Sequence, residues 1–112
     1  MIKLNLKKLN YIAIVLFAAF AIACSASQPP KELIDAREAY QKAEASQAEK
    51  YVPAELHKAK DALNAAENSF KDDADSYTTK DLAYIADRKA KLAVVQAESA
   101  MAKENATKAK EE

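Results

Sequence analysis

Few residues in this sequence are of types that carry out chemistry, and they are scattered along the chain. The 112 residues include one cysteine, Cys24, and one histidine, His57. A zinc site needs several thiolate or imidazole ligands, so we expect no metal at His57 and an exposed helical side chain instead. The sequence contains no glycine, which removes the tight loops that bind phosphate groups and nucleotides.

A second candidate is the acidic run of Asp72, Asp73 and Asp75, whose carboxylates could attract Ca²⁺. The calcium loop of an EF-hand requires a glycine at its sharp turn and a bidentate glutamate at its twelfth position. Here the glycine is absent, and Tyr84 occupies the twelfth position counted from Asp73. We therefore expect a solvated turn and no calcium site.

Catalysis also lacks a basis in this sequence. Neither a nucleophile elbow nor a loop that could form an oxyanion hole is present. Thin helices with alanine-rich faces leave little room for a pocket that could enclose a ligand. We expect no catalytic residues, no cofactor apart from a covalent lipid, and no small-molecule substrate. The protein is predicted not to be an enzyme.

Cys24 has a specific context, because it follows a segment typical of an export signal. Residues 1–23 contain three lysines and no acidic residue, and the apolar run 11–23 follows the lysines. This run has 13 residues, whereas a membrane-spanning helix needs about 20. The pattern favours a signal peptide over residues 1–23 that is cleaved, rather than a stable transmembrane anchor.

The residues around Cys24 add a modification to this export signal. The lipobox of bacterial lipoproteins is similar to the run Ala21-Ile22-Ala23-Cys24, although that family more often has Leu where Ala21 stands. The resemblance implies cleavage between Ala23 and Cys24 and lipidation of the Cys24 thiol. Fatty chains such as palmitate then anchor the protein in a membrane, since each buried CH₂ group contributes about 0.8 kcal/mol.

Ser25, which follows the cysteine, implies a location. In the sorting rule for bacteria with two membranes, Asp at this position retains a lipoprotein in the inner membrane. Ser25 therefore predicts the outer membrane, with the protein facing the periplasm. In a cell with one membrane, the same anchor predicts the outer face of the cytoplasmic membrane. Residues 24–30, which end in two prolines, are expected to be the lipidated cysteine and a flexible tether.

The charge of the mature chain argues against nucleic acid as a partner. Removing the three lysines of residues 1–23 leaves 14 basic against 17 acidic residues, a formal charge of −3. Binding to a phosphate backbone requires a basic face instead. Acidic residues that precede a basic residue by four positions predict solvated helix faces. These pairs are Glu38 with Lys42, Glu67 with Lys71, Asp87 with Lys91, and Glu104 with Lys108.

Residues 31–112 are predicted to form a helical domain with helices at about 31–51, 53–72 and 79–110. The first two helices follow from an internal repeat, because the Pro-x-Glu-Leu motif at Pro30 recurs at Pro53. Proline suits a first helical turn, and Glu in that turn complements the positive end of the helix dipole. Val52 precedes a proline and so marks a break. Thr78 and Asp81 have the form of a capping box for the third helix.

Alanines at spacings of three and four line one face of the third helix. They are Ala83, Ala86, Ala90, Ala93, Ala97 and Ala100. Such small side chains let neighbouring helices approach closely, as in an alanine-seamed coiled coil. We predict an all-α fold, either an antiparallel three-helix bundle or a long helical hairpin. Because the third helix is longer than the others, its last turns, 101–112, must fray, overhang or meet another molecule.

The order of these features resembles a known family. The two Pro-x-Glu-Leu helices, the acidic turn and the run LAYIADRKA at 82–90 are similar to a domain of unknown function found in helical envelope lipoproteins. The resemblance covers about residues 30–105. In that family the domain is often followed by an OmpA-like peptidoglycan-binding domain. Such a domain is not expected here, so we do not expect peptidoglycan binding by that route.

These observations together predict a lipoprotein anchored in the outer membrane. Its helical domain is expected to act as a non-catalytic structural or protein-interaction module of the cell envelope, with an envelope protein or a second copy as partner. Two alternatives stay open. One is a tether to peptidoglycan, although Lys110 is followed by Glu111 and Glu112 and so is displaced from the end of the chain. The other is a self-assembling coiled-coil spacer.

Overall fold

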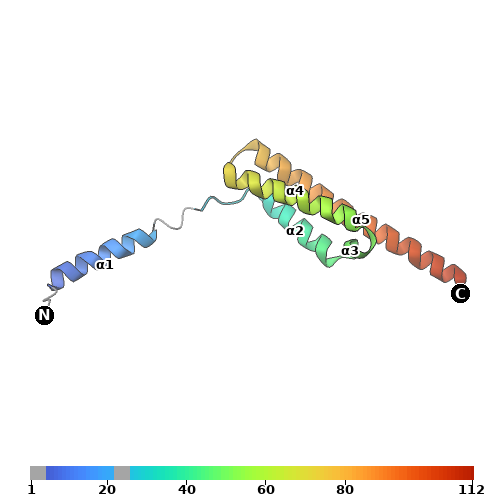
Figure 1. Ribbon diagram of the computed structural model, residues 1–112, viewed down its shortest axis with the longest axis horizontal. Helices are drawn as coiled ribbons and strands as arrows, with labels where there is room; N and C mark the ends of the chain where they lie inside the picture. The colour runs from blue at the N-terminus through green and yellow to red at the C-terminus, as the bar shows by residue number, and fades with distance from the viewer. Residues whose placement is uncertain (1–4, 22–25) are drawn as a thin grey trace.

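The computed structural model describes residues 5–21 and 26–112 (Figure 1). Its helices are α1 (Leu6–Ala21), α2 (Lys31–Ala45), α3 (Ala48–Tyr51), α4 (Pro53–Asp72) and α5 (Tyr77–Glu111). The described ranges contain no strand, so the predicted all-α fold is confirmed. Ala23, Cys24 and Ser25 lie outside the described residues, and with them the predicted cleavage and lipidation site.

The long helix α5 is the central element of a three-helix bundle. Helices α2 and α4 each pack along α5, whereas α2 and α4 share a smaller interface. In Figure 1, α2 and α5 run in the same direction and α4 runs in the opposite one. Of the two architectures that the sequence predicts, the structure has the three-helix bundle.

Helix α1 lies outside this bundle. Its 16 residues contact none of the other described helices. No helix in the part of the chain that the structure describes combines the length and the apolar character needed to cross a membrane. Among the residues whose burial the structure describes, those of the core lie between Leu33 and Ala97, and residues 6–15 of α1 are exposed.

The core of the bundle is built mostly of alanine. Five of the six alanines predicted to line α5 are buried, and Ala100 is half-buried. They face small residues on the other helices, namely Ala36, Ala39, Ala43, Ala48, Ala59 and Ala66. Leu33 is the largest apolar side chain that is fully buried. Half-buried residues such as Leu63 and Phe70 cover the edges of this narrow core.

The predicted helix over 31–51 is wrong in one respect, because it is two helices in the structure. Helix α2 ends at Ala45, and the chain turns at 46–47 before α3 begins. The Ser46 hydroxyl donates to the Ala43 carbonyl at 2.6 Å and accepts from the Ala48 amide at 3.1 Å. A side chain that takes over backbone partners in this way competes with the helix. The turn returns Ala48, five positions after Ala43, to the core.

The start of α5 also differs from the prediction. Helix α5 begins at Tyr77, and its N-cap is Ser76, whose hydroxyl accepts from the Thr79 amide at 3.1 Å. The predicted capping box of Thr78 and Asp81 is therefore wrong, because Thr78 already lies inside the first turn. Both Ser and Thr are favoured N-caps, and only the fold of the preceding turn selects between them.

Thr79 holds the turn between α4 and α5 together from the inside. Its side chain is fully buried, and its hydroxyl donates to the Asp73 carbonyl at 2.8 Å. The hydroxyl groups of Ser69 and Ser76 lie 2.7 and 2.9 Å from the same oxygen. Since the Thr79 proton points to Asp73, both serines donate to Thr79. This set of hydrogen bonds fixes where α4 ends and α5 begins.

We expect Thr79→Val to lower the free energy of unfolding by about 1–3 kcal/mol, because it removes the buried hydroxyl that bonds the Asp73 carbonyl and two serine hydroxyls. Urea unfolding followed by circular dichroism measures the loss. Thr78→Val, at an exposed site one residue earlier, is the matched control and should change stability by less than about 0.5 kcal/mol. Equal losses in the two variants would contradict this role of the Thr79 hydroxyl.

A second expectation concerns the size of the core side chains. Ala66 is fully buried against α2 and α5, so Ala66→Leu should push the helices apart and cost about 1–3 kcal/mol. The neighbouring Ala65 is exposed, and Ala65→Leu should be nearly neutral. The same unfolding measurement compares them. A core that accepts leucine at residue 66 without loss would show that close helix approach does not depend on alanine.

Candidate functional site

A groove between α2 and α5 is the first candidate site. It has a volume of about 420 Å³ and is lined by Asp35, Glu38, Ala39, Lys42, Asp87, Lys91, Val94 and Val95. Asp87 is only 7% exposed, and the Lys91 ammonium lies 2.9 Å from both of its carboxylate oxygens. The predicted pair of Asp87 with Lys91 is confirmed, although its acidic end is buried rather than solvated. The Asp87 Oδ1 atom has no well-directed hydrogen bond.

The groove offers contacts of two kinds. Its lining combines the apolar side chains of Ala39 and Val94 with charged side chains of both signs, among them the buried Asp87. No thiol, imidazole or hydroxyl group is among its lining residues. Surfaces that mix apolar and polar side chains are typical of contacts between proteins.

A second hollow lies between α2 and α4 near His57 and has a volume of about 490 Å³. The side chain of His57 is 73% exposed, as the sequence predicts, and its Nε2 atom lies 3.4 Å from Asp61. On the opposite wall, burial and then the neighbouring Glu44 raise the pKa of Tyr40. In the described ranges, no three His, Cys, Asp or Glu side chains are grouped so that they could hold a metal ion.

One ion pair joins α2 to α4. Arg37 donates two hydrogen bonds to the Glu67 carboxylate, at 2.5 Å from Nε and 2.8 Å from Nη2. These hydrogen bonds hold the pKa of Glu67 below its usual value, against the opposing effect of burial. The predicted pairing of Glu67 with Lys71 is thus replaced by a contact between helices. Glu38 and Lys42, both in the described part of the chain, are not joined within 4.0 Å.

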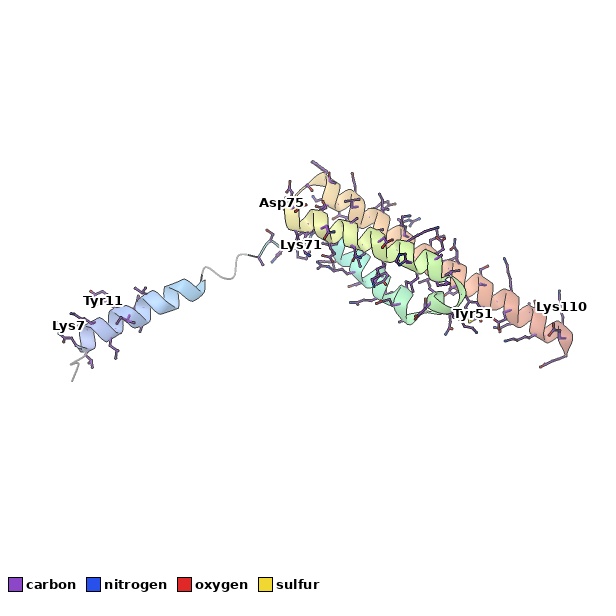
Figure 2. The ribbon with its side chains drawn as sticks, in the orientation of Figure 1. Lys7, Tyr11, Tyr51, Lys71, Asp75 and Lys110 are labelled. Carbon is purple, nitrogen blue, oxygen red and sulfur yellow. The ribbon has the colours of Figure 1, made fainter. Side chains whose placement is uncertain are left out.

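The last turns of α5 extend beyond the bundle, which is one of the three outcomes predicted for them (Figure 1). In Figure 2, Tyr51 lies at the end of the bundle and Lys110 lies well beyond it on α5. Glu104 links this extension to α3, since it lies 2.5 Å from Lys108 and 4.0 Å from Lys50. The hydrogen bond from Lys108, followed by that from Tyr51, lowers the pKa of Glu104 to about 2.

Helix α5 carries a second row of apolar side chains that are exposed, and Val95 of this row lies at the edge of the groove between α2 and α5. Ile85, Leu92 and Val95 are 44%, 49% and 60% exposed. We call the exposed apolar residues of this row the outer stripe. They are Ile85, Leu92, Val95, Ala102, Ala106 and Ala109. A helix that packs through one face normally presents polar residues on the opposite face. The outer stripe is therefore an apolar surface that is exposed in the described part of the chain.

The outer stripe is not among the features predicted from the sequence, although the sequence contains a signal for it. The heptad positions of the buried alanines are 83, 90 and 97, together with 86, 93 and 100. A second series with the same spacing begins two residues later, at residue 85. All six members of the outer stripe lie on this second series. This second pattern is harder to recognise, because its members differ in size and two of its positions, Arg88 and Ser99, are polar.

Comparison with known proteins adds a family. The sequence profile of a domain of unknown function, DUF4398, matches residues 31–109. The chain belongs to this family. The match spans α2 to α5 and so covers the whole bundle of this DUF4398 protein. No curated protein and no solved structure gives a significant match to the chain. The lipoprotein character of the chain stays a prediction.

The contact between Arg37 and Glu67 leads to a pH dependence. Because the pKa of Glu67 is lowered in the folded state, the pair stabilises the protein above the ordinary value of 4.5, and this stabilisation is lost as the pH falls through the lowered pKa. Glu67→Gln should cost about 1 kcal/mol at pH 7, given the partial exposure of the pair, and its deficit should shrink as the pH falls from about 5. Unfolding at a series of pH values measures this.

The control for this series is Glu38→Gln on the exposed face of α2. It removes a carboxylate of the same kind but no contact between helices, so its stability should follow that of the parent chain at every pH. A deficit of Glu67→Gln that stays constant down to acidic pH would argue against the charged contact and for a change in packing.

Proposed function

We propose that this DUF4398 protein is a lipid-anchored protein of the cell envelope whose helical domain is a non-catalytic protein-interaction module. The observation that carries the proposal is the outer stripe, which is exposed along α5 and continues into the turns beyond the bundle. A helix face with Ile85, Leu92 and Val95 exposed gains free energy when another apolar surface covers it.

Two features support interaction over catalysis. The most buried carboxylate, that of Asp87, is neutralised by Lys91, and Glu67 is held by Arg37. These charged groups already have partners within the chain and so serve structure. A small bundle with an alanine core also has modest stability of its own, which a bound partner increases by mass action.

The lipid anchor is supported by the leader sequence and by the independence of the bundle from it. Helix α1 has 16 residues and a length of about 24 Å, which is shorter than the roughly 30 Å of a hydrocarbon core. Because α1 contacts none of the other described helices, cleavage after Ala23 would remove no part of the core. The order of basic residues, apolar run and Cys24 is that of a lipoprotein signal.

We further propose the periplasmic face of the outer membrane as the location, on the basis of Ser25. In this arrangement the proline-rich residues 26–30 space the bundle from the lipid surface. The mechanism is positional, since the anchor confines the bundle to two dimensions and raises its effective concentration toward a partner at the same surface.

The proposal is tested by growth with labelled palmitate. The full chain should carry the label and Cys24→Ala should lose it entirely, because no other cysteine is present. Membrane fractionation of the same cells should place the labelled chain in the outer membrane. Ser25→Asp is the matched control and should keep the label but move to the inner membrane. An unlabelled parent chain would refute the anchor, and a labelled chain in the inner membrane would refute the location alone.

A further inference from the structure

The outer stripe has the length and pattern of a coiled-coil seam. From Ile85 to Ala109 it spans 24 positions of α5, about 36 Å at 1.5 Å per residue. Its members occupy two positions of the heptad repeat. Arg88 and Ser99 occupy the same two heptad positions but are polar. A heptad pattern sustained over three to four repeats is typical of helices that pair lengthwise.

We propose that the occupant of the outer stripe is a second copy of this chain, with the two α5 helices antiparallel. The inference rests on the interaction face of the proposed function and names its partner. In one register, Leu92 packs against Val95 of the second copy, and Ile85 packs against Ala102 of the second copy. Both layers are apolar, and the larger pair of side chains lies near the centre of the seam.

The charges beside the seam select this antiparallel register. It places Lys91 next to Glu98 of the second copy, and the two-fold symmetry repeats this attraction at the other side of the interface. Lys91 keeps its contact with Asp87, because an ammonium group has three protons to donate. A parallel pair in register would place Arg88 directly against Arg88 of the second copy, whereas the antiparallel pair places it against Ser99 of the second copy.

The same register accounts for the turns of α5 that extend beyond the bundle. Ala106 comes beside Asp81 of the second copy, and Ala109 comes beside Thr78 of the second copy. The extension of each copy therefore lies along the bundle of the other. Residues 78–109 of both chains then take part in the seam, which is more than four heptads.

Cysteine crosslinking in intact cells tests the arrangement. Full-length chains with Ile85→Cys and with Ala102→Cys, carrying different tags, are expressed together and oxidised. The antiparallel register predicts a disulfide-linked dimer that contains both tags. Ala102→Cys expressed alone should give no dimer, because its two copies would be about 25 Å apart along the axis. The parent chain, whose sole cysteine is Cys24, sets the background.

Each outcome of the crosslinking experiment bears on a different part of the proposal. Crosslinking of Ala102→Cys to itself would overturn the antiparallel register in favour of a parallel pair. A crosslink of either variant to a different protein, with no dimer that contains both tags, would overturn the second copy as the occupant. Absence of any crosslink above background would overturn the proposal as well.

A charge reversal provides an independent measurement. Glu98→Lys turns two attractive contacts with Lys91 into two repulsive ones, so the association constant of the purified full chain in detergent should fall roughly tenfold. High salt should recover part of this loss by screening. Glu111→Lys makes the same charge change on the opposite face of α5 and should leave association unchanged. Equal effects of both variants would overturn the predicted contact.

Failure of this inference can be told apart from failure of the proposed function. Palmitate labelling is followed in the cells used for crosslinking. A labelled chain without the dimer overturns the self-association and leaves the anchor standing. A dimer that contains both tags in an unlabelled chain supports the antiparallel seam and overturns the anchor.

Discussion

The structure depends on how closely three helices can approach one another. Methyl groups fill the interface of α5 with both α2 and α4, so each contact buries little apolar area but brings the backbones near. A leucine at a buried position such as Ala66 would push the helices apart at that level of the bundle. Since alanine has the highest helix propensity, the same residues also stabilise the individual helices. Alanine therefore favours both the close approach of the helices and the formation of each helix.

Because the alanine seam specifies little besides distance, polar contacts determine where each helix ends and how it is oriented. Ser46 ends α2, and Thr79 joins α4 to α5 through its buried hydroxyl. Arg37 and Glu67 then set the position of α2 relative to α4, where the apolar interface is smaller. Each of these polar groups fixes a helix end or a helix position that the repeated alanines do not specify.

The sequence predicts the parts of this fold that follow from local periodicity. The alanine spacing identifies the buried face of α5, and the proline after Val52 identifies the break before α4. It does not predict the partner of Glu67, because Arg37 lies 30 positions away in the chain. It also misses the turn at Ser46 and the choice of Ser76 as N-cap, because several Ser and Thr residues offer similar local hydrogen bonds. The exposed outer stripe is visible in the sequence only once the buried stripe has been assigned.

The small side chains of the core have a thermal consequence. The heat capacity of unfolding grows with the apolar area that becomes hydrated, and an alanine exposes far less of it than a leucine. The curvature of the stability curve with temperature is therefore shallow for this bundle. Its stability therefore falls off less steeply on either side of its optimum temperature than that of a bundle of the same length with a leucine core.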